Sequence, residues 1–156
     1  MSDTIIEGGC FCADVRYHAT EPPRGEGGAW HCKNCRHANA APYFACVSFE
    51  TDNLETDKFR FIKGEPIRYR YTSEMVVGEG DSDDFPVGHV LWSEWWFCGR
   101  CGTRIAHIHE GLADLDDEGE ERIGQLSITT CTLDDPDAFP PQHYSMQQEK
   151  LSWVKI

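Results

Sequence analysis

The sequence predicts a mainly β protein, and three observations lead to this expectation. Short segments in which apolar and polar side chains alternate recur along the chain. Apolar residues at helical spacing are scarce, and a content of 40% hydrophobic and 12% aromatic residues is typical of a folded globular chain. Because the 156 residues contain no repeat and no low-complexity linker, we expect residues 1–156 to form a single domain.

The clearest strand signal lies at Ile67–Tyr71, where bulky apolar or aromatic residues alternate with arginines. A second extended segment, Phe59–Lys63, precedes it, and the connection Gly64–Pro66 favours a hairpin between the two. In chain order, strands are expected at Val15–His18, Tyr43–Phe49, Phe59–Lys63, Ile67–Tyr71, Ser93–Phe97, Arg104–His109, Gln125–Thr129 and Leu151–Ile156.

The segments between these strands predict turns and loops. Short helical turns are expected around Cys32–His37 and Asp134–Phe139. The stretch at about 78–88 is rich in acidic residues and predicts a long, insertion-like surface loop. A second acidic run covers Asp114–Glu121, and neither run has the glycine and glutamate spacing of a calcium-binding EF-hand loop.

Charge and composition exclude several classes of partner. A formal net charge of −13 repels nucleic-acid phosphates and anionic lipid, so neither is expected to bind. The N-terminal residues lack the basic start and apolar segment of a secretory signal, and no stretch approaches the length of a membrane span. We therefore expect a cytoplasmic protein whose eight cysteines stay reduced, so that metal binding is favoured over a disulfide framework.

Two cysteine pairs far apart in the chain predict a metal site. Cys10 and Cys12 stand near the start, whereas Cys98 and Cys101 form a Cys-x-x-Cys-Gly sequence typical of a zinc knuckle. Neither pair provides the four ligands of a closed zinc site, but both together do. We interpret the four as a structural zinc site, because four thiolates leave no coordination position for a substrate.

A third cysteine pair, Cys32 and Cys35, allows several interpretations. Its spacing lets both thiols face one metal ion or form a redox pair, and the neighbouring Lys33 and Arg36 favour the thiolate form. Two reduced cysteines in a turn are an equally simple reading. A zinc ion here needs a further ligand, and the sequence does not decide among His31, Cys46 and His89.

Other notable residues are expected to be structural. Cys46 and Cys131 lie in apolar, strand-like contexts that predict buried small side chains. His107 and His109 share one face of a predicted strand and can line a pocket, although such histidines are common on half-exposed strands. An aromatic cluster precedes the knuckle and comprises Trp92, Trp95, Trp96 and Phe97. It predicts core packing, and one of its tryptophans can instead line a ligand pocket.

Several of these motifs together resemble the glutathione-dependent formaldehyde-activating enzyme family, which includes centromere protein V-type domains. The resemblance extends in order over nearly the whole chain. It implies a β-tent fold of packed antiparallel sheets, a structural zinc at Cys10, Cys12, Cys98 and Cys101, and carbon–sulfur lyase chemistry on a glutathione adduct. The matching segments are Gly8–Cys12, Val15–Tyr17, His31–Arg36, Ala41–Phe44, Phe97–Thr103, Thr132–Pro136, His143 and Trp153.

The chain departs from this family at the second cysteine group. The family's catalytic segment resembles Cys-His-Cys-x-x-Cys, and this chain has Trp30 at the first cysteine. The resemblance therefore implies a second zinc held by Cys32 and Cys35, one thiolate short, with Lys33 or Arg36 pairing a glutathione carboxylate. The main hypothesis is a zinc-binding carbon–sulfur lyase acting on a small thiol adduct. The alternative is a non-catalytic, zinc-stabilised binding module in which Trp30 occupies the vacant metal site.

Overall fold

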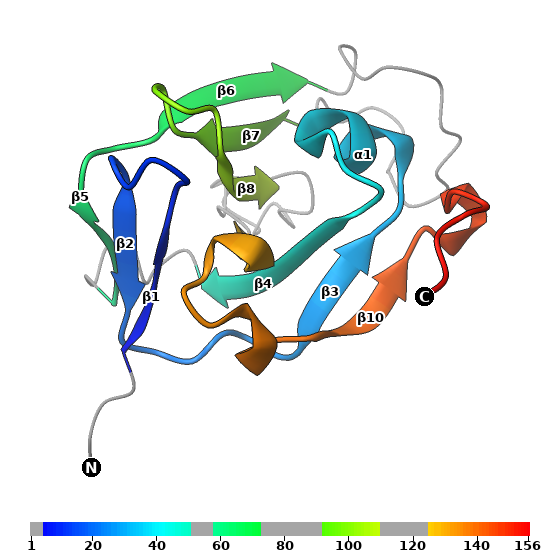
Figure 1. Ribbon diagram of the computed structural model, residues 1–156, viewed down its shortest axis with the longest axis horizontal. Coiled ribbons are helices and arrows are strands. Elements are labelled where there is room, and N and C mark those ends of the chain that lie inside the picture. Colours follow the sequence, from blue (N-terminus) through cyan, green and yellow to red (C-terminus); the bar gives the residue numbers. More distant parts are fainter. Residues whose placement is uncertain (1–4, 51–57, 73–91, 110–124) are drawn as a thin grey trace, which may run out of the picture.

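The computed structural model describes residues 5–50, 58–72, 92–109 and 125–156, and these residues form two β-sheets with one short α-helix (Figure 1). The strands are β1 (Ile6–Gly9), β2 (Arg16–Ala19), β3 (Gly27–Trp30), β4 (Phe44–Glu50), β5 (Phe59–Lys63), β6 (Ile67–Thr72), β7 (Trp92–Phe97), β8 (Arg104–His109), β9 (Gln125–Thr129) and β10 (Pro141–Ser145). Helix α1 covers Lys33–Asn39, and three 3-10 turns are η2 (Thr130–Thr132), η3 (Pro136–Ala138) and η4 (Gln147–Glu149). No helix in these ranges is long and apolar enough to cross a membrane.

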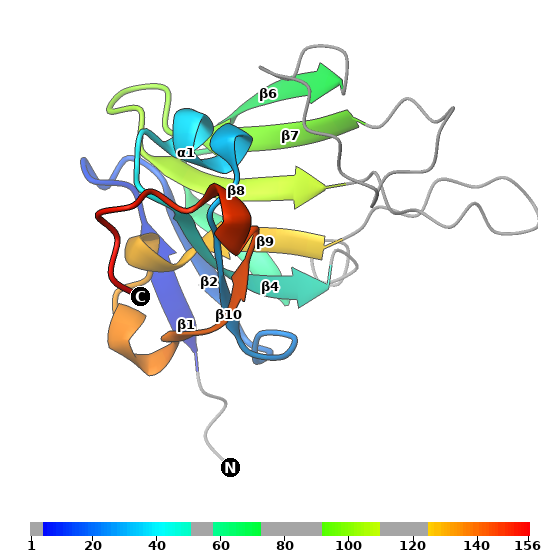
Figure 2. The same ribbon diagram turned by 90° about the vertical axis from the view of Figure 1, so that its right-hand side faces the viewer.

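The two sheets differ in size and share no strand. The small sheet has the order β1-β2-β5, and the large sheet has the order β10-β3-β4-β9-β8-β7-β6. Figure 2 shows β6, β7, β8 and β9 running side by side across the large sheet. All strand pairs of the described residues are antiparallel except β3 with β10, which is parallel. A parallel pair needs a long crossover, and here most of the chain lies between the two strands.

The main core lies between the two sheets. Tyr17 and Phe59 of the small sheet are fully buried, and their rings stack with centroids 5.3 Å apart. Phe49, Leu126 and other alternate residues of the large sheet pack against them in one buried cluster. The period-2 alternation of the strands thus separates an inner face from an outer face of the large sheet.

The outer face of the large sheet carries helix α1. Cys35 and Ala38 of the helix pack against a smaller buried cluster formed by Phe44, Cys46 and Trp95. The helix starts after Cys32, whose sulfur accepts a hydrogen bond from the backbone N–H of Cys35, and it ends where Ala40 adopts a left-handed backbone conformation. This packing fixes the third cysteine pair at the edge of the outer face.

The mainly β prediction is confirmed, and most expected strands are present. Two expectations are wrong. Phe59–Lys63 and Ile67–Thr72 do not form a hairpin, because β5 pairs with β2 and β6 pairs with β7, so their short connection links the two sheets. Leu151–Ile156 forms turns instead of a strand, with Trp153 64% exposed. The acidic stretches at 78–88 and Asp114–Glu121, together with His89, lie outside the described residues.

Candidate functional site

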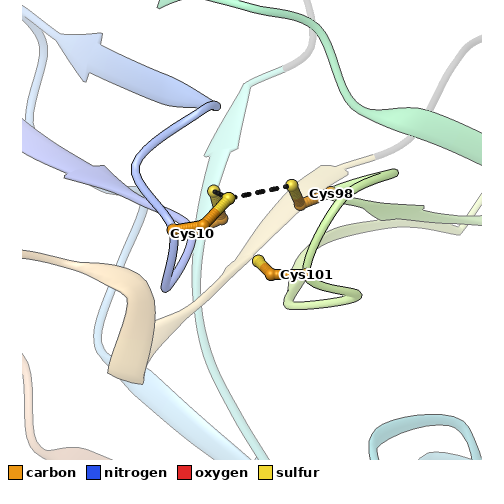
Figure 3. A group of neighbouring side chains, drawn as sticks. Cys10, Cys98 and Cys101 are labelled. Atoms are coloured by element: carbon orange, nitrogen blue, oxygen red, sulfur yellow. Dashed lines mark hydrogen bonds between the residues drawn. The ribbon is translucent and has the colours of Figure 1, made fainter.

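The four cysteines predicted to bind zinc come together from the two sheets. Cys10 and Cys12 lie in the turn after β1, and Cys98 and Cys101 lie in the turn after β7 (Figure 3). All four sulfur atoms lie within 4.8 Å of one another. The Cys10 and Cys12 sulfurs are 3.6 Å apart, and those of Cys12 and Cys98 are 3.7 Å apart.

These separations fit a tetrahedral metal–thiolate site. With a zinc–sulfur bond of about 2.3 Å, tetrahedral geometry separates two sulfur ligands by about 3.8 Å. The two measured separations are close to this value, and the remaining sulfurs lie near enough for the cluster to hold one ion of this size. Burial adds to the fit, because Cys10 and Cys98 are only 6% and 2% exposed.

Backbone groups of the two turns direct hydrogen bonds at the sulfurs. The N–H of Val15 lies 3.3 Å from the Cys10 sulfur, and the N–H of Arg100 lies 3.4 Å from the Cys98 sulfur. Gly102 closes the second turn with a φ of 76°, a conformation that favours glycine over any side-chain-bearing residue. Such donors stabilise thiolates, the form in which cysteine binds a metal.

The neighbouring sulfurs of the cluster oppose one another's ionisation. The side chain of Thr103 and backbone hydrogen bonds lower the pKa of Cys101 to about 5. A backbone hydrogen bond from Asp14 also favours the Cys12 thiolate, but burial and the neighbouring sulfurs outweigh it and raise the pKa of Cys12 to about 12. A bound divalent cation offsets the repulsion between neighbouring thiolates and lets the four cysteines bind it in their ionised form.

Thr103 connects the two cysteine turns directly, a role that the cysteine spacing alone does not indicate. Its hydroxyl oxygen accepts a hydrogen bond from the backbone N–H of Phe11 at 3.1 Å. The same hydroxyl lies 3.2 Å from the Cys101 sulfur. The only sequence signal for this role is its place in the segment Phe97–Thr103.

The third pair, Cys32 and Cys35, forms a separate site at the start of α1. Their sulfurs are 2.7 Å apart, and the backbone N–H of Cys35 lies 3.4 Å from the Cys32 sulfur. The hydrogen bond from the Cys35 thiol lowers the pKa of Cys32 to about 7, although burial opposes the shift. The same contact, together with burial, raises the pKa of Cys35.

A comparison with known families identifies the family of this chain. A family model described as glutathione-dependent formaldehyde-activating enzyme matches residues 5–149. The chain belongs to this family. No curated protein gives a significant match to the chain. Membership of the family and a cysteine cluster able to hold a metal ion are thus established by independent observations.

Within the part of the chain that the structure describes, the second cysteine group does not complete a zinc site. Among residues 5–50, 58–72, 92–109 and 125–156, no third histidine, cysteine or carboxylate ligand atom joins the Cys32 and Cys35 sulfurs within 4.8 Å. A zinc ion with an open position needs three protein ligands. Of the predicted candidates, His31 is fully buried with no hydrogen-bond partner for either ring nitrogen, and its ring packs 5.3 Å from that of Tyr43. Burial also lowers the pKa of His31.

Trp30, which the resemblance places at the first cysteine of the family's segment, borders a groove on the outer face of the large sheet. The indole is 41% exposed and lines a groove of about 370 Å³ together with Cys46, Ser48 and His143. Burial raises the pKa of Cys46 to about 11, although a hydrogen bond from Trp30 opposes the shift. Since Cys46 also packs next to Cys35, the groove and the thiol pair are neighbours on the outer face.

The residues expected to bind substrate are close to the pair in the chain: Lys33 lies between the two cysteines, and Arg36 follows the second. Lys33 has an exposed side chain, and its backbone N–H donates to a Glu149 carboxylate oxygen at 2.7 Å. Arg36 donates from Nε to the carbonyl of His31 at 3.1 Å. Both cations therefore lie within one turn of the helix start, and their role toward a ligand remains a prediction.

The remaining sequence candidates have different environments. His107 stacks on Trp95 with ring centroids 4.1 Å apart and lies 3.4 Å from the Tyr71 hydroxyl, whereas the side chain of His109 is outside the described residues. Trp95 and Trp96 are buried, as core packing predicts. Cys46 is buried as expected, but Cys131 is exposed, because it lies in the 3-10 turn η2 and not in a strand.

Proposed function

We propose that this chain is a zinc-stabilised, carbon–sulfur lyase-like enzyme that acts on an adduct of glutathione or another small thiol. The observation that carries the proposal is the pair Cys32 and Cys35, with sulfurs 2.7 Å apart, in a member of this family. Cys35 packs against the cluster that contains Cys46, and Cys46 lines the groove next to it. Cytoplasm, where thiols stay reduced, is the compartment that suits such a pair.

Zinc is our choice of metal for the four-cysteine cluster. Thiolate ligands in tetrahedral arrangement favour zinc over the hard cations magnesium and calcium. With all four positions taken by sulfur, the ion has a structural role and contributes to folding, not to the reaction. The proposed chemistry therefore depends on the chain's own groups at the other site.

Cys32 is our candidate for the group that moves a proton. When a hydroxymethyl thioether breaks down, a base takes the hydroxyl proton, the carbon–sulfur bond breaks as the aldehyde forms, and the sulfur leaves as a thiolate that can take the proton back from the base. In the reverse reaction the substrate thiol loses its proton before it attacks the aldehyde. The pKa of Cys32, lowered to about 7 by the hydrogen bond from Cys35, suits a base that works near neutral pH.

The basic residues beside the pair suit a substrate that carries carboxylates. Glutathione has two carboxylates, and Lys33 or Arg36 can pair with one of them through a charge-assisted hydrogen bond. The protein is otherwise strongly acidic, with a net charge of −13, so a local cation is needed to hold an anionic ligand. The proposed partner is thus a small molecule.

A non-catalytic binding module is the second candidate, and Trp30 favours it. The described residues supply only two metal ligands at this site, and the half-exposed indole offers a flat surface for stacking in the groove. In this alternative the zinc-stabilised domain holds a small thiol compound or a peptide without changing it.

The rate of formaldehyde and glutathione condensation tests the proposal. We expect the wild-type protein to exceed the spontaneous rate, and Cys32→Ser and Cys35→Ser to lose this excess. Cys131→Ser, which removes an exposed cysteine elsewhere, should retain it. If the wild type gives no excess rate, the lyase proposal is wrong, and calorimetric titration with glutathione then decides whether the protein binds the thiol at all.

A further inference from the structure

The protein contains two groups of cysteines whose sulfur spacing differs. In the four-cysteine cluster, neighbouring sulfurs lie 3.6 and 3.7 Å apart, close to the spacing of ligands around one metal ion. The sulfurs of Cys32 and Cys35 lie 2.7 Å apart, closer than two sulfur ligands around one such ion, so in this arrangement they face each other as a pair. A disulfide bond is about 2.05 Å long, so bond formation needs only about 0.7 Å of further approach.

The local backbone holds the pair at this short distance. Cys32 precedes the first turn of α1, and Cys35 lies in that turn, so the two side chains share one side of the helix start. The hydrogen bond from the backbone N–H of Cys35 to the Cys32 sulfur fixes the side chain of Cys32. Arg36 Nε donates a 3.1 Å hydrogen bond to the carbonyl of His31, the residue before Cys32, and so restrains the chain next to the pair.

The two thiols also have different surroundings. Cys35 packs against the buried cluster of Phe44, Cys46 and Trp95. Cys32 stands at the cap, outside this cluster, and is followed by the exposed Lys33. A cationic neighbour favours attack by a thiolate on an incoming disulfide. An outer, attacking thiol and an inner, resolving thiol are what a dithiol exchange reaction requires.

We propose that Cys32 and Cys35 form a reversible dithiol–disulfide pair that reduces small-molecule disulfides. The Cys32 thiolate attacks one sulfur of the disulfide, forms a mixed disulfide and releases the first thiolate. Cys35 then loses its proton and attacks the Cys32 sulfur, and the second thiolate leaves. The two cysteines are oxidised to one disulfide, and the small disulfide is reduced to two thiols. This activity goes beyond the proposed lyase and does not depend on it.

The experiment uses reduced, zinc-loaded protein carrying Cys131→Ser, which removes the exposed cysteine that can form a mixed disulfide by itself. The protein is treated with bis(2-hydroxyethyl) disulfide, quenched with iodoacetamide and analysed by intact mass and peptide mapping. We expect a loss of two hydrogens located between Cys32 and Cys35, with the four cysteines of the zinc cluster unchanged. A stable mercaptoethanol adduct, a disulfide involving other cysteines, or no reaction at this pair overturns the proposal.

Two variants in the same background test the order of the steps. Cys35→Ser should stop at a mixed disulfide on Cys32, and Cys32→Ser should react at least tenfold more slowly than the parent. If Cys35→Ser does not fold, Cys35→Ala serves in its place, and the mass analysis of the parent remains decisive. Equal reactivity of the parent and Cys32→Ser contradicts the proposal. Since the readout is a disulfide, a negative lyase assay leaves this result unaffected.

Discussion

The sulfur atoms of Cys12 and Cys98 lie 3.7 Å apart although 86 residues separate them in the chain. Cys12 follows a strand of the small sheet, and Cys98 follows a strand of the large sheet. A metal ion bound between them therefore joins the two sheets at one end of the core. Because such a link closes a long loop of the unfolded chain, it stabilises the folded state strongly.

Zinc removal should unfold the protein or lower its stability severely. We expect about one zinc ion per chain in purified protein, and Cys98→Ser should lose it along with several kcal/mol of folding free energy. Elemental analysis and thermal denaturation with and without a chelator measure both effects. Cys131→Ser and Cys32→Ser serve as controls and should keep the zinc. A content of about two that falls to one in Cys32→Ser would reveal a second metal site at the thiol pair.

Restoring a cysteine at position 30 should create a second metal site. Trp30→Cys gives the chain a Cys-His-Cys-x-x-Cys segment, the pattern that the family resemblance implies, and three thiolates are enough to hold zinc with one open position. We expect the zinc content to rise by about one ion per chain. Trp30→Ser, which also removes the indole but adds no thiol, is the matched control. The same zinc content in both variants would contradict the prediction.

Two strand glycines, one in each sheet, should respond differently to substitution by alanine. A Cβ atom at Gly8 would collide with the Tyr17 hydroxyl and with the backbone carbonyl of Thr132. A Cβ atom at Gly28 would meet the Trp30 Nε1 atom at 3.5 Å, an ordinary contact. Gly8→Ala should therefore cost about 2–3 kcal/mol of unfolding free energy, and Gly28→Ala should change it by less than about 1 kcal/mol. Urea denaturation measures both, and similar losses would show that the collision is relieved elsewhere.

The buried carboxylate of Glu94 should make stability depend on pH. Burial alone raises the pKa of Glu94, but hydrogen bonds from Trp96 Nε1 at 3.0 Å and Arg70 Nη2 at 2.8 Å outweigh it, so the pKa lies below its usual range. The ionised Glu94 therefore stabilises the folded state. This contribution to the unfolding free energy is present above the unfolded-state pKa of about 4.3 and is lost as the pH falls through the folded-state pKa.

Glu94→Gln should accordingly lower the unfolding free energy by about 1–3 kcal/mol at neutral pH. The difference from the wild type should shrink as the pH falls below about 4, and it should be lost only below the lowered folded-state pKa of Glu94, where both side chains are neutral. Urea denaturation of both proteins over a pH series measures this difference, and loss of zinc at low pH affects both alike. A difference that stays constant with pH would mean that Glu94 acts through packing instead of charge.

Local sequence patterns were sufficient to predict most of the strands and the four-cysteine metal cluster. Alternation with period 2 indicates a strand and its buried face, as in Arg104–His109 and Gln125–Thr129. It does not indicate the partner strand, which is why a hairpin was expected where β5 and β6 belong to different sheets. The strands Ile6–Gly9, Gly27–Trp30 and Pro141–Ser145 were missed, because glycine, proline and polar residues leave no alternation to detect.

The order and type of the residues define which chemistry is available to this protein: four cysteines in two turn-forming pairs, a third pair beside basic residues, and Trp30 where the resemblance implies a cysteine. Only the tertiary structure decided how these groups combine. It brought the four sulfurs within 4.8 Å of one another and left Cys32 and Cys35 as a close pair without a third ligand among the described residues. The reason is physical: residue type and spacing set what a side chain can bind, whereas the distance between remote segments depends on how two sheets pack around one core.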